Sequence, residues 1–296
     1  MPGIVSLLPS GTEWVYALGV QDELAGVTFE CDHPPGVRER HPVVVRGLDT
    51  AGLGPAEIDA LVRSRIAEGG PLYVLDEPEL SRIAPDVVLT QDICEVCTLP
   101  AGEVDAALES VGRPSRVITL DPHRLPDVLE SAVRVAEAAG VPERGRRLDA
   151  DLRTRLDRVA TAVRHLDRPQ VLVVEWTDPP FLAGHWVPDL IEVAGGVPVL
   201  AEPGGRSTVT TWEVVAGSDP GVVVVAPCGF GLPEAEQHAR SVLDRLPPGA
   251  AVWAIDAGAY VTRPGPRVVD AVEALAYALH PDAVPAPPPG CVSRVR

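Results

Sequence analysis

The sequence lacks any apolar stretch near the roughly 20 residues that a membrane-spanning helix needs. It also lacks a basic segment followed by a long apolar run at its N-terminus, where the apolar run covers only Ile4 to Leu8. A secretory signal needs both features, so we expect no export signal and a cytoplasmic location. Thiols are kept reduced in that compartment, so we expect the five cysteines as thiols or metal ligands rather than as disulfides.

Positive charge is scarce as well, since the net charge is −17 and the sequence pI is about 4.8. An acidic surface repels phosphate backbones and anionic lipid, so we expect neither nucleic acid nor a membrane as a partner. The sequence contains no internal repeat, no P-loop, no Gly-x-Ser-x-Gly elbow and no Gly-x-Gly-x-x-Gly fingerprint. Nucleotide binding and the common hydrolase chemistries are therefore unsupported.

The chain does contain short β-branched runs that alternate with helical segments, and 46% of its residues are hydrophobic. Most of these runs are apolar throughout, as is typical of strands buried on both faces of a parallel sheet. The alternation predicts an α/β fold with ligands at the carboxyl ends of the strands. The expected strands are Ile4–Leu8, Val43–Val45, Asp86–Thr90, Arg116–Leu120, Gln170–Glu175, Gly221–Ala226 and Ala251–Ile255.

The stretch from Pro126 to Leu166 has no strand signal, and its second half, Glu143–Leu166, has an apolar face at helical spacing. A helix of that length spans roughly 36 Å and could join two α/β halves. The alternative is a surface helix of one larger sheet. We expect an N-terminal α/β lobe (1–125), linking helices (126–168), a C-terminal α/β lobe (169–283) and a proline-rich tail (284–296), of which residues 284–290 should be extended and exposed.

Polar, aromatic and sulfur-containing residues follow the predicted strands directly. Because the carboxyl ends of parallel strands meet at one edge of a sheet, we expect these side chains to face one crevice. The candidate ligand-binding residues are Glu30, Asp32, Gln91, Glu175, Trp176, Phe181, His185, Trp186, Phe230 and Tyr260.

Three aromatic residues, Trp176, Phe181 and Trp186, lie within eleven positions of a chain that is only 4% aromatic. This density favours an aromatic wall for a large flat ligand over ordinary packing at the edge of a sheet. Glu175 ends its predicted strand, where it could act as a ligand or a base or could pair with an arginine.

Cysteine and histidine could supply a metal site in the same crevice. Cys94 and Cys97 form a single C-x-x-C, which is a weak zinc signal without a second pair. Cys31 and His33 could complete a tetrahedral site, with Cys228 as a further ligand for zinc, iron or an iron–sulfur cluster. The alternative is that these cysteines are buried structural thiols.

Two glutamates lie at the fourth position of a possible capping box. Ser10 precedes Glu13, and Thr210 precedes Glu213, each at the spacing that lets a hydroxyl and a carboxylate cap the start of a helix. Capping alone would account for both glutamates.

Several of these segments resemble the cobalamin and iron-chelate binding proteins of ABC importers. The similar segments run in order along nearly the whole chain and include Ser6–Glu13, Cys31–Pro35, Pro85–Leu89, Pro179–Phe181 and Asp219–Val225. The resemblance implies two Rossmann-like lobes joined by a single long helix, with the ligand in the cleft between them. Gln91–Cys97 and Glu175–Phe181 are most similar to a cytoplasmic sub-branch of cobalamin-binding proteins.

The resemblance also implies partners. In the importers one glutamate on each lobe docks on permease arginines, and Glu213 corresponds to the second position, while the first falls at Glu77 or, as we prefer, Glu79. The lack of an export signal and the cysteines depart from the ordinary importer pattern and weaken a transport role. Our first hypothesis is therefore a binding protein without catalysis, for cobalamin or a related corrinoid or metal chelate. The alternative is a cytoplasmic metal-dependent enzyme or sensor that uses the cysteines.

Overall fold

The computed structural model describes residues 2–92, 102, 104, 108 and 115–296, and the chain forms two separate β-sheets in two compact units. Unit 1 comprises Met1–Pro122 and Asp127–Asp151, and unit 2 comprises His123–Pro126 and Leu152–Arg296. Two α/β lobes, each with its own sheet, confirm the predicted fold class. The finer boundaries of the sequence analysis stay a prediction.

Unit 1 is built on a six-stranded sheet with the strand order β4-β3-β2-β1-β5-β6. All neighbouring pairs are parallel except β3 and β4, so an antiparallel strand forms one edge. Val5, Val44 and Val88 lie in its core beside Leu80, which explains why the strand runs are apolar. The strands are β1 (Ile4–Ser6), β2 (Leu24–Thr28), β3 (Val43–Gly47), β4 (Tyr73–Leu75), β5 (Val87–Thr90) and β6 (Arg116–Thr119).

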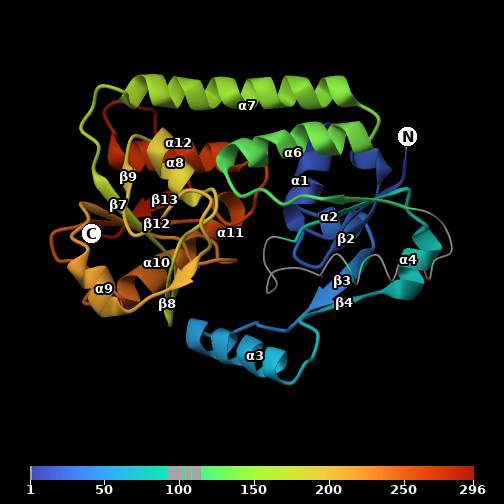
Figure 1. Cartoon of the computed structure of the whole chain (residues 1–296), viewed down its shortest axis with the longest axis horizontal. Coiled ribbons are helices and arrows are strands. Elements are labelled where there is room, and N and C mark those ends of the chain that lie inside the picture. The colour runs from blue at the N-terminus through green and yellow to red at the C-terminus, as the bar shows by residue number, and fades with distance from the viewer. Residues whose placement is uncertain (1, 93–101, 103, 105–107, 109–114) are drawn as a thin grey trace. The chain divides into compact units, whose positions relative to one another are not determined.

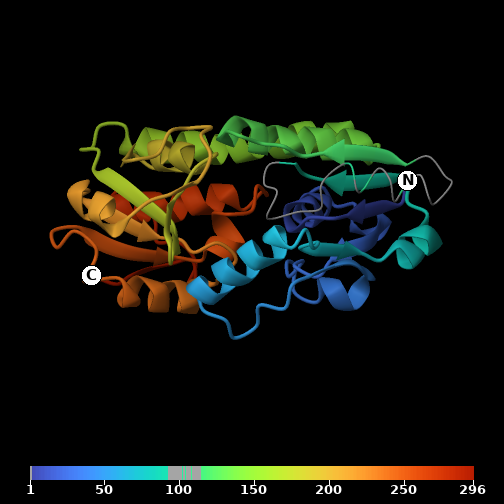
Figure 2. The ribbon, with the colours of Figure 1, turned by 60° about the horizontal axis from the view of Figure 1, so that its bottom comes forward.

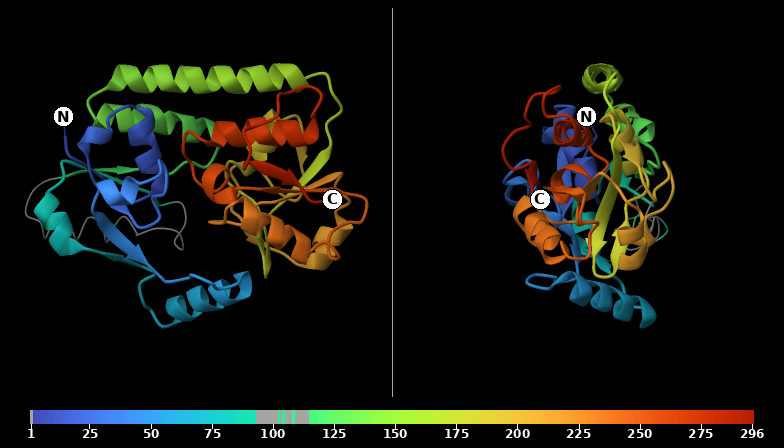
Figure 3. Two further views of the ribbon diagram at one scale, coloured as in Figure 1. Left: turned by 180° about the vertical axis from the view of Figure 1, so that it is seen from behind. Right: turned by 90° about the vertical axis from the view of Figure 1, so that its left-hand side faces the viewer.

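The helices of this half of the chain differ in how much they bury. Helix α1 buries six of its nine residues, whereas α3 buries none and lies at the end of the β3–β4 pair, away from α1 (Figure 1, Figure 3). The helices are α1 (Pro9–Ala17), the 3-10 turn η1 (Gln21–Glu23), α2 (Val37–Arg40), α3 (Pro55–Ala67), α4 (Glu77–Ile83) and α6 (Leu125–Ala138).

Both predicted capping boxes are wrong. Proline favours the first helical position, and Pro9 starts α1 there, so Leu8 is the N-cap and Ser10 lies inside the first turn. In α9 (Trp212–Gly217) the cap is Thr211 rather than Thr210, and its hydroxyl accepts a hydrogen bond from the Val214 N–H at 3.4 Å.

Unit 2 is built on a seven-stranded sheet with the order β10-β8-β7-β11-β12-β13, in which β9 also pairs with β7. The central strands β7, β11 and β12 are parallel, and β8, β10 and β13 join them antiparallel. The strands are β7 (Gln170–Thr177), β8 (Pro180–Leu182), β9 (Val197–Pro198), β10 (Thr208–Val209), β11 (Val222–Val225), β12 (Ala251–Ile255) and β13 (Val292–Arg294).

Helices cover both faces of this second sheet. Helix α10 packs on one face through Ala235 and Ala239, while α8 and α12 pack together on the opposite face (Figure 1, Figure 2). Because helices cover both faces of the sheet, every residue of the central strand Val222–Val225 is buried. The helices are α8 (Val187–Val193), α10 (Leu232–Ser241), α11 (Ala257–Tyr260) and α12 (Val268–Leu279).

Helix α7 (Pro142–Val163) is continuous, and the boundary between the units falls inside it. In unit 1, the Arg144 guanidinium donates to the carbonyls of Leu18 and Gly19. In unit 2, the Arg155 guanidinium pairs with Asp270 and Glu273 on α12 at 2.5–2.7 Å. Among the described residues, no helix is both long enough and apolar enough to cross a bilayer.

The proline-rich tail consists of two parts. Residues 284–290 are mostly exposed, but Cys291 is buried and the following strand β13 pairs with β12. The Arg296 guanidinium donates to the carbonyl oxygens of Leu243, Pro247 and Ala250. The last residues therefore extend the sheet of unit 2.

Candidate functional site

Backbone hydrogen bonds join the end of β7 to the loop that leaves β11, and that loop to the segment that follows β12. The Cys228 N–H donates to the Glu175 carbonyl at 2.9 Å, and the Gly258 N–H donates to the Phe230 carbonyl at 3.0 Å. Parallel strands bring these loops to the same edge of the sheet, where α/β proteins bind their ligands. Within unit 2 the predicted residues of three loops therefore lie close together.

Four rings, which we call the aromatic cluster, gather at this edge: Trp176, Phe181, Phe230 and His238. The ring centroids of Trp176 and Phe230 are 5.8 Å apart, and those of Phe230 and His238 are 4.8 Å apart. Phe181 is the cross-strand partner of Trp176 in the β7–β8 hairpin, so both side chains lie on one face. All four are half-buried and present a partly exposed aromatic surface.

His238 is the one member of the aromatic cluster that was not predicted from the sequence as a ligand-binding residue. The side chains of Thr177 and His238 are hydrogen-bonded at 3.1 Å between Oγ1 and Nδ1. Burial lowers the pKa of His238, and the nearby Glu234 opposes this only in part. The imidazole is therefore neutral near pH 7.

Trp186 lies outside the aromatic cluster. It is 5% exposed, and its indole N–H donates to the Val261 carbonyl at 2.9 Å. This buried anchor supports the loop before α8 and leaves little of the ring for a ligand.

Tyr260 is also held by its own unit. Its phenol is hydrogen-bonded to the Cys291 thiol, and the Arg267 guanidinium lies 5.6 Å from the ring centroid. Burial is the largest cause of a raised pKa for Tyr260, and the contact with Cys291 adds to it. The phenol therefore stays protonated.

The predicted residues of unit 1 occupy a different kind of surface. The carboxyl ends of β1, β2 and β5 and the first turns of α1 carry mainly buried polar side chains, although Phe29 follows β2 and packs 6.2 Å from Tyr73 between ring centroids. Gln91 is buried, Glu30 is half-buried and Asp32 is exposed. The buried polar residues at this edge are Ser6, Ser10, Thr12, Glu13, Thr28, Thr90 and Gln91.

The predicted metal site stays a prediction. Cys94 and Cys97 lie outside the described residues, and Cys31 is 1% exposed, with its thiol 3.1 Å from the Thr12 hydroxyl. His33 is exposed in unit 1, and Cys228 is exposed in unit 2. Within the described part of the chain, no group of three or more His, Cys, Asp or Glu side chains could hold a metal ion.

Both candidate docking glutamates lie in the first turn of a short helix. Glu79 makes two hydrogen bonds to Arg82, at 2.6 and 2.8 Å, which lower the pKa of its carboxyl. The Thr211 hydroxyl lowers the pKa of Glu213. Both side chains are therefore charged near neutral pH.

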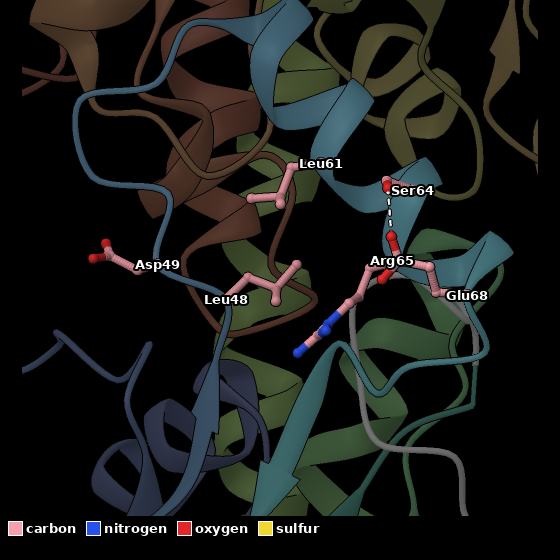
Figure 4. Close-up of a pocket in the computed structure, with 6 residues that line it drawn as sticks. All are labelled: Leu48, Asp49, Leu61, Ser64, Arg65 and Glu68. Carbon is pink, nitrogen blue, oxygen red and sulfur yellow. Dashed lines mark hydrogen bonds between the residues drawn. The ribbon is translucent and has the colours of Figure 1, made fainter.

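A cavity of about 260 Å³ lies in unit 1 between the end of β3 and helix α3 (Figure 4). Its lining includes Leu48, Leu61 and Arg65, but none of the candidate ligand residues. Small-molecule pockets are typically about 300–1,000 Å³ and largely apolar, so this hollow is a poor candidate for the ligand site.

No family model matches the chain. The vitamin B12-binding protein of Vibrio cholerae is 23% identical over 279 residues, which cover 91% of this chain and 86% of that protein. The resemblance to chelate-binding proteins of ABC importers is thereby confirmed. An uncharacterized ABC transporter substrate-binding lipoprotein of Bacillus subtilis, YvrC, is 22% identical over 94% of this chain and 80% of its own length.

The same fold occurs in solved structures. A periplasmic haem-binding protein from Pseudomonas aeruginosa superposes with a TM-score of 0.70 at 24% identity, covering 99% of this chain and 98% of that one. The fold of both units is therefore that of periplasmic chelate-binding proteins.

Proposed function

We propose that this chain is a binding protein for a flat metal chelate, with cobalamin or a related corrinoid as the first candidate. The observation that supports this most is the aromatic cluster at the carboxyl ends of β7 and β11. The Phe230 ring lies 5.8 Å from that of Trp176 and 4.8 Å from that of His238, between centroids, in a chain that is only 4% aromatic. The relatives named for vitamin B12 and haem binding support the same class of ligand.

The chemistry of the cluster suits a macrocycle. A corrinoid or porphyrin has wide apolar faces, and half-buried rings gain stability when such a face covers them. Trp176, Phe181 and Phe230 are the residues that we assign to this contact in unit 2. Trp186 is left out because it is already buried.

Unit 1 offers hydrogen-bonding groups instead. The amide of Gln91 and the hydroxyl of Ser10 lie at its carboxyl edge, and such groups suit the polar side chains at the rim of a corrinoid. The placement of the ligand in a cleft between the two lobes stays a prediction from the resemblance.

A permease partner is a second part of the proposal and conflicts with the predicted location. Glu213 is charged and exposed, as docking on an arginine requires, whereas Glu79 is charged but half-buried and would have to exchange Arg82 for a permease arginine. A cytoplasmic protein would not meet the outer face of an importer. Fractionation of the native host decides between these two, because recovery outside the cytosol supports docking and recovery in the cytosol contradicts it.

The experiment that tests the proposal is purification of the untagged protein, followed by its visible spectrum and metal content. A corrinoid or haem spectrum that is lost in Trp176→Ala but kept in a matched control, Trp253→Ala, supports it. Trp253 is the control because its ring contacts Tyr277 rather than the cluster. Bound zinc or iron without any chelate would instead favour the alternative metalloprotein.

A further inference from the structure

Two imidazoles lie together in unit 2, outside the aromatic cluster. His123 lies in the segment before α6, and His185 lies between β8 and α8. Their ring centroids are 6.2 Å apart, and the ring planes are tilted by 43°. His123 is exposed and His185 is half-buried, with its Nδ1 atom buried, so a metal would have to bind His185 at Nε2.

The segment that carries His123 is fixed by a buried carboxylate. The neighbouring Arg124 guanidinium makes a bidentate contact with Asp189 on α8 at 2.6–3.0 Å. The Leu125 N–H donates to the same carboxylate at 2.9 Å, and Asp189 is 6% exposed. Charge-assisted and bidentate bonds of this kind hold a segment firmly.

The loop that carries His185 is fixed independently. Its backbone is in the left-handed region, with φ 53°, which is strained for a residue with a side chain. Two backbone bonds hold it there, from the His185 N–H to the Gly205 carbonyl and from the Gly204 N–H to the His185 carbonyl. A Cβ at Gly184 would lie 2.4 Å from the Ser207 nitrogen, so only glycine allows this approach.

Strain that is kept in place by specific bonds is typical of functional positions. Here its effect is to set the His185 ring opposite that of His123. Bonds between a metal and an imidazole nitrogen are about 2.0–2.1 Å long, so the centroids of two rings that share one metal lie roughly 5 Å apart in a tetrahedral arrangement and roughly 6.4 Å apart in a linear one. The 6.2 Å separation in unit 2 lies near the wide end, so the two imidazoles would take nearly opposite positions on the metal.

We propose that His123 and His185 form a two-imidazole site for a divalent first-row transition metal such as Co²⁺, Ni²⁺, Cu²⁺ or Zn²⁺. Imidazole suits these ions, whereas Mg²⁺ and Ca²⁺ prefer oxygen ligands. No third side chain among the described residues completes the set, so water or ligands brought by the metal fill the other positions. The site therefore takes a metal with at least two open coordination positions. It does not depend on the proposed chelate function.

The test is a titration of the untagged protein with Co²⁺, followed by calorimetry and by visible absorption. His123→Ala and His185→Asn remove one imidazole each, and asparagine is chosen because it tolerates the left-handed backbone. We expect each variant to bind Co²⁺ at least about tenfold more weakly and the double variant to lose the imidazole-bound signal. The matched control is His165→Ala, an exposed histidine of the same unit, which should bind as the unchanged protein does.

Circular dichroism and urea unfolding show whether each variant keeps its fold, so a loss of binding with an intact fold supports the site. Unchanged Co²⁺ binding in the double variant overturns it, as does the absence of Co²⁺ binding in the unchanged protein. Binding through the cysteines is distinguished because it gives thiolate charge-transfer absorption and survives both substitutions. No chelate is present in this titration, so its failure leaves chelate binding untouched.

Discussion

The carboxyl edges of the two sheets differ in how many buried polar side chains they carry. Eight of the ten buried polar side chains among the described residues belong to unit 1, and seven of these lie at or near the ends of β1, β2 and β5. Unit 2 has only Thr177 and Asp189 among them, and its edge carries the aromatic cluster. The edge of unit 1 is thus the richer in buried hydrogen-bonding groups, and the edge of unit 2 carries the aromatic cluster.

This difference separates the two kinds of contact that an amphipathic ligand needs. Ring surfaces give affinity in proportion to the apolar area that they cover, whereas buried polar groups give selectivity because they are costly when unpaired. We therefore expect substitutions in unit 2 to change affinity and substitutions in unit 1 to change which chelate is preferred.

The largest effect should come from Asp189→Ala, which removes the acceptor of Arg124 and of the Leu125 N–H. Loss of this buried, bidentate contact should lower the free energy of unfolding by about 2–4 kcal/mol. The loss stays within this range because the Arg124 side chain is half-exposed, so water can solvate its charge once Asp189 is gone. Urea unfolding measures it. The control is Arg240→Ala, whose partner Glu236 lies 3.5 Å away at the surface, where an ion pair contributes about 0–1 kcal/mol. Equal effects of the two substitutions would contradict this role for Asp189.

Next in size, Trp176→Ala should weaken chelate binding by about 1–3 kcal/mol, which is the range for burying a large apolar side chain. Phe230→Ala should act similarly, and the double variant should lose less than the sum because the two rings touch. Calorimetric titration of each variant gives the affinities. Trp186→Phe should change them little, and a larger loss there than at Trp176 would show that the wrong rings were assigned.

The sequence predicts the elements far better than the clusters. All seven expected strands form, because a strand that is buried on both faces of a parallel sheet has a continuous apolar sequence. The short strands β4, β8, β9, β10 and β13 have no such apolar run and were not predicted. His238 meets Thr177 across 61 positions, and Arg124 meets Asp189 across 65. Such pairs depend on topology, and an isolated histidine on an amphipathic helix carries no signal of its own.

The pH dependence of unit 2 should report on His238. Its pKa is lowered in the folded protein, so below the unfolded value near 6.5 the unfolded chain binds the extra proton first. Stability due to the neutral imidazole is therefore present above about pH 6.5 and is lost as the pH falls further towards the folded pKa. Urea unfolding between pH 7.5 and about 5 should show a smaller loss in His238→Gln. An identical pH profile in the two proteins would contradict this assignment.

The smallest effect on stability should come from Ser10→Ala in unit 1. The Ser10 hydroxyl is 2% exposed and has no hydrogen-bond partner within the described part of the chain, so its removal should leave stability unchanged or raise it by up to about 1 kcal/mol. Thr12→Val is the matched variant, because it breaks the contact with Cys31 and should destabilise by about 1 kcal/mol. Thermal unfolding compares the stabilities of the two variants. A larger loss of stability in Ser10→Ala than in Thr12→Val would contradict this prediction.

The central claim, that this chain binds a flat metal chelate, is tested most directly by titrating the untagged protein with cobalamin, its precursor cobinamide and haem while recording tryptophan fluorescence. We predict quenching with a Kd at or below the micromolar range, about −8 kcal/mol, for at least one of them, and a weaker response in Trp176→Ala. No binding of any corrinoid or haem at high micromolar concentration, by a protein that unfolds cooperatively, would contradict the claim.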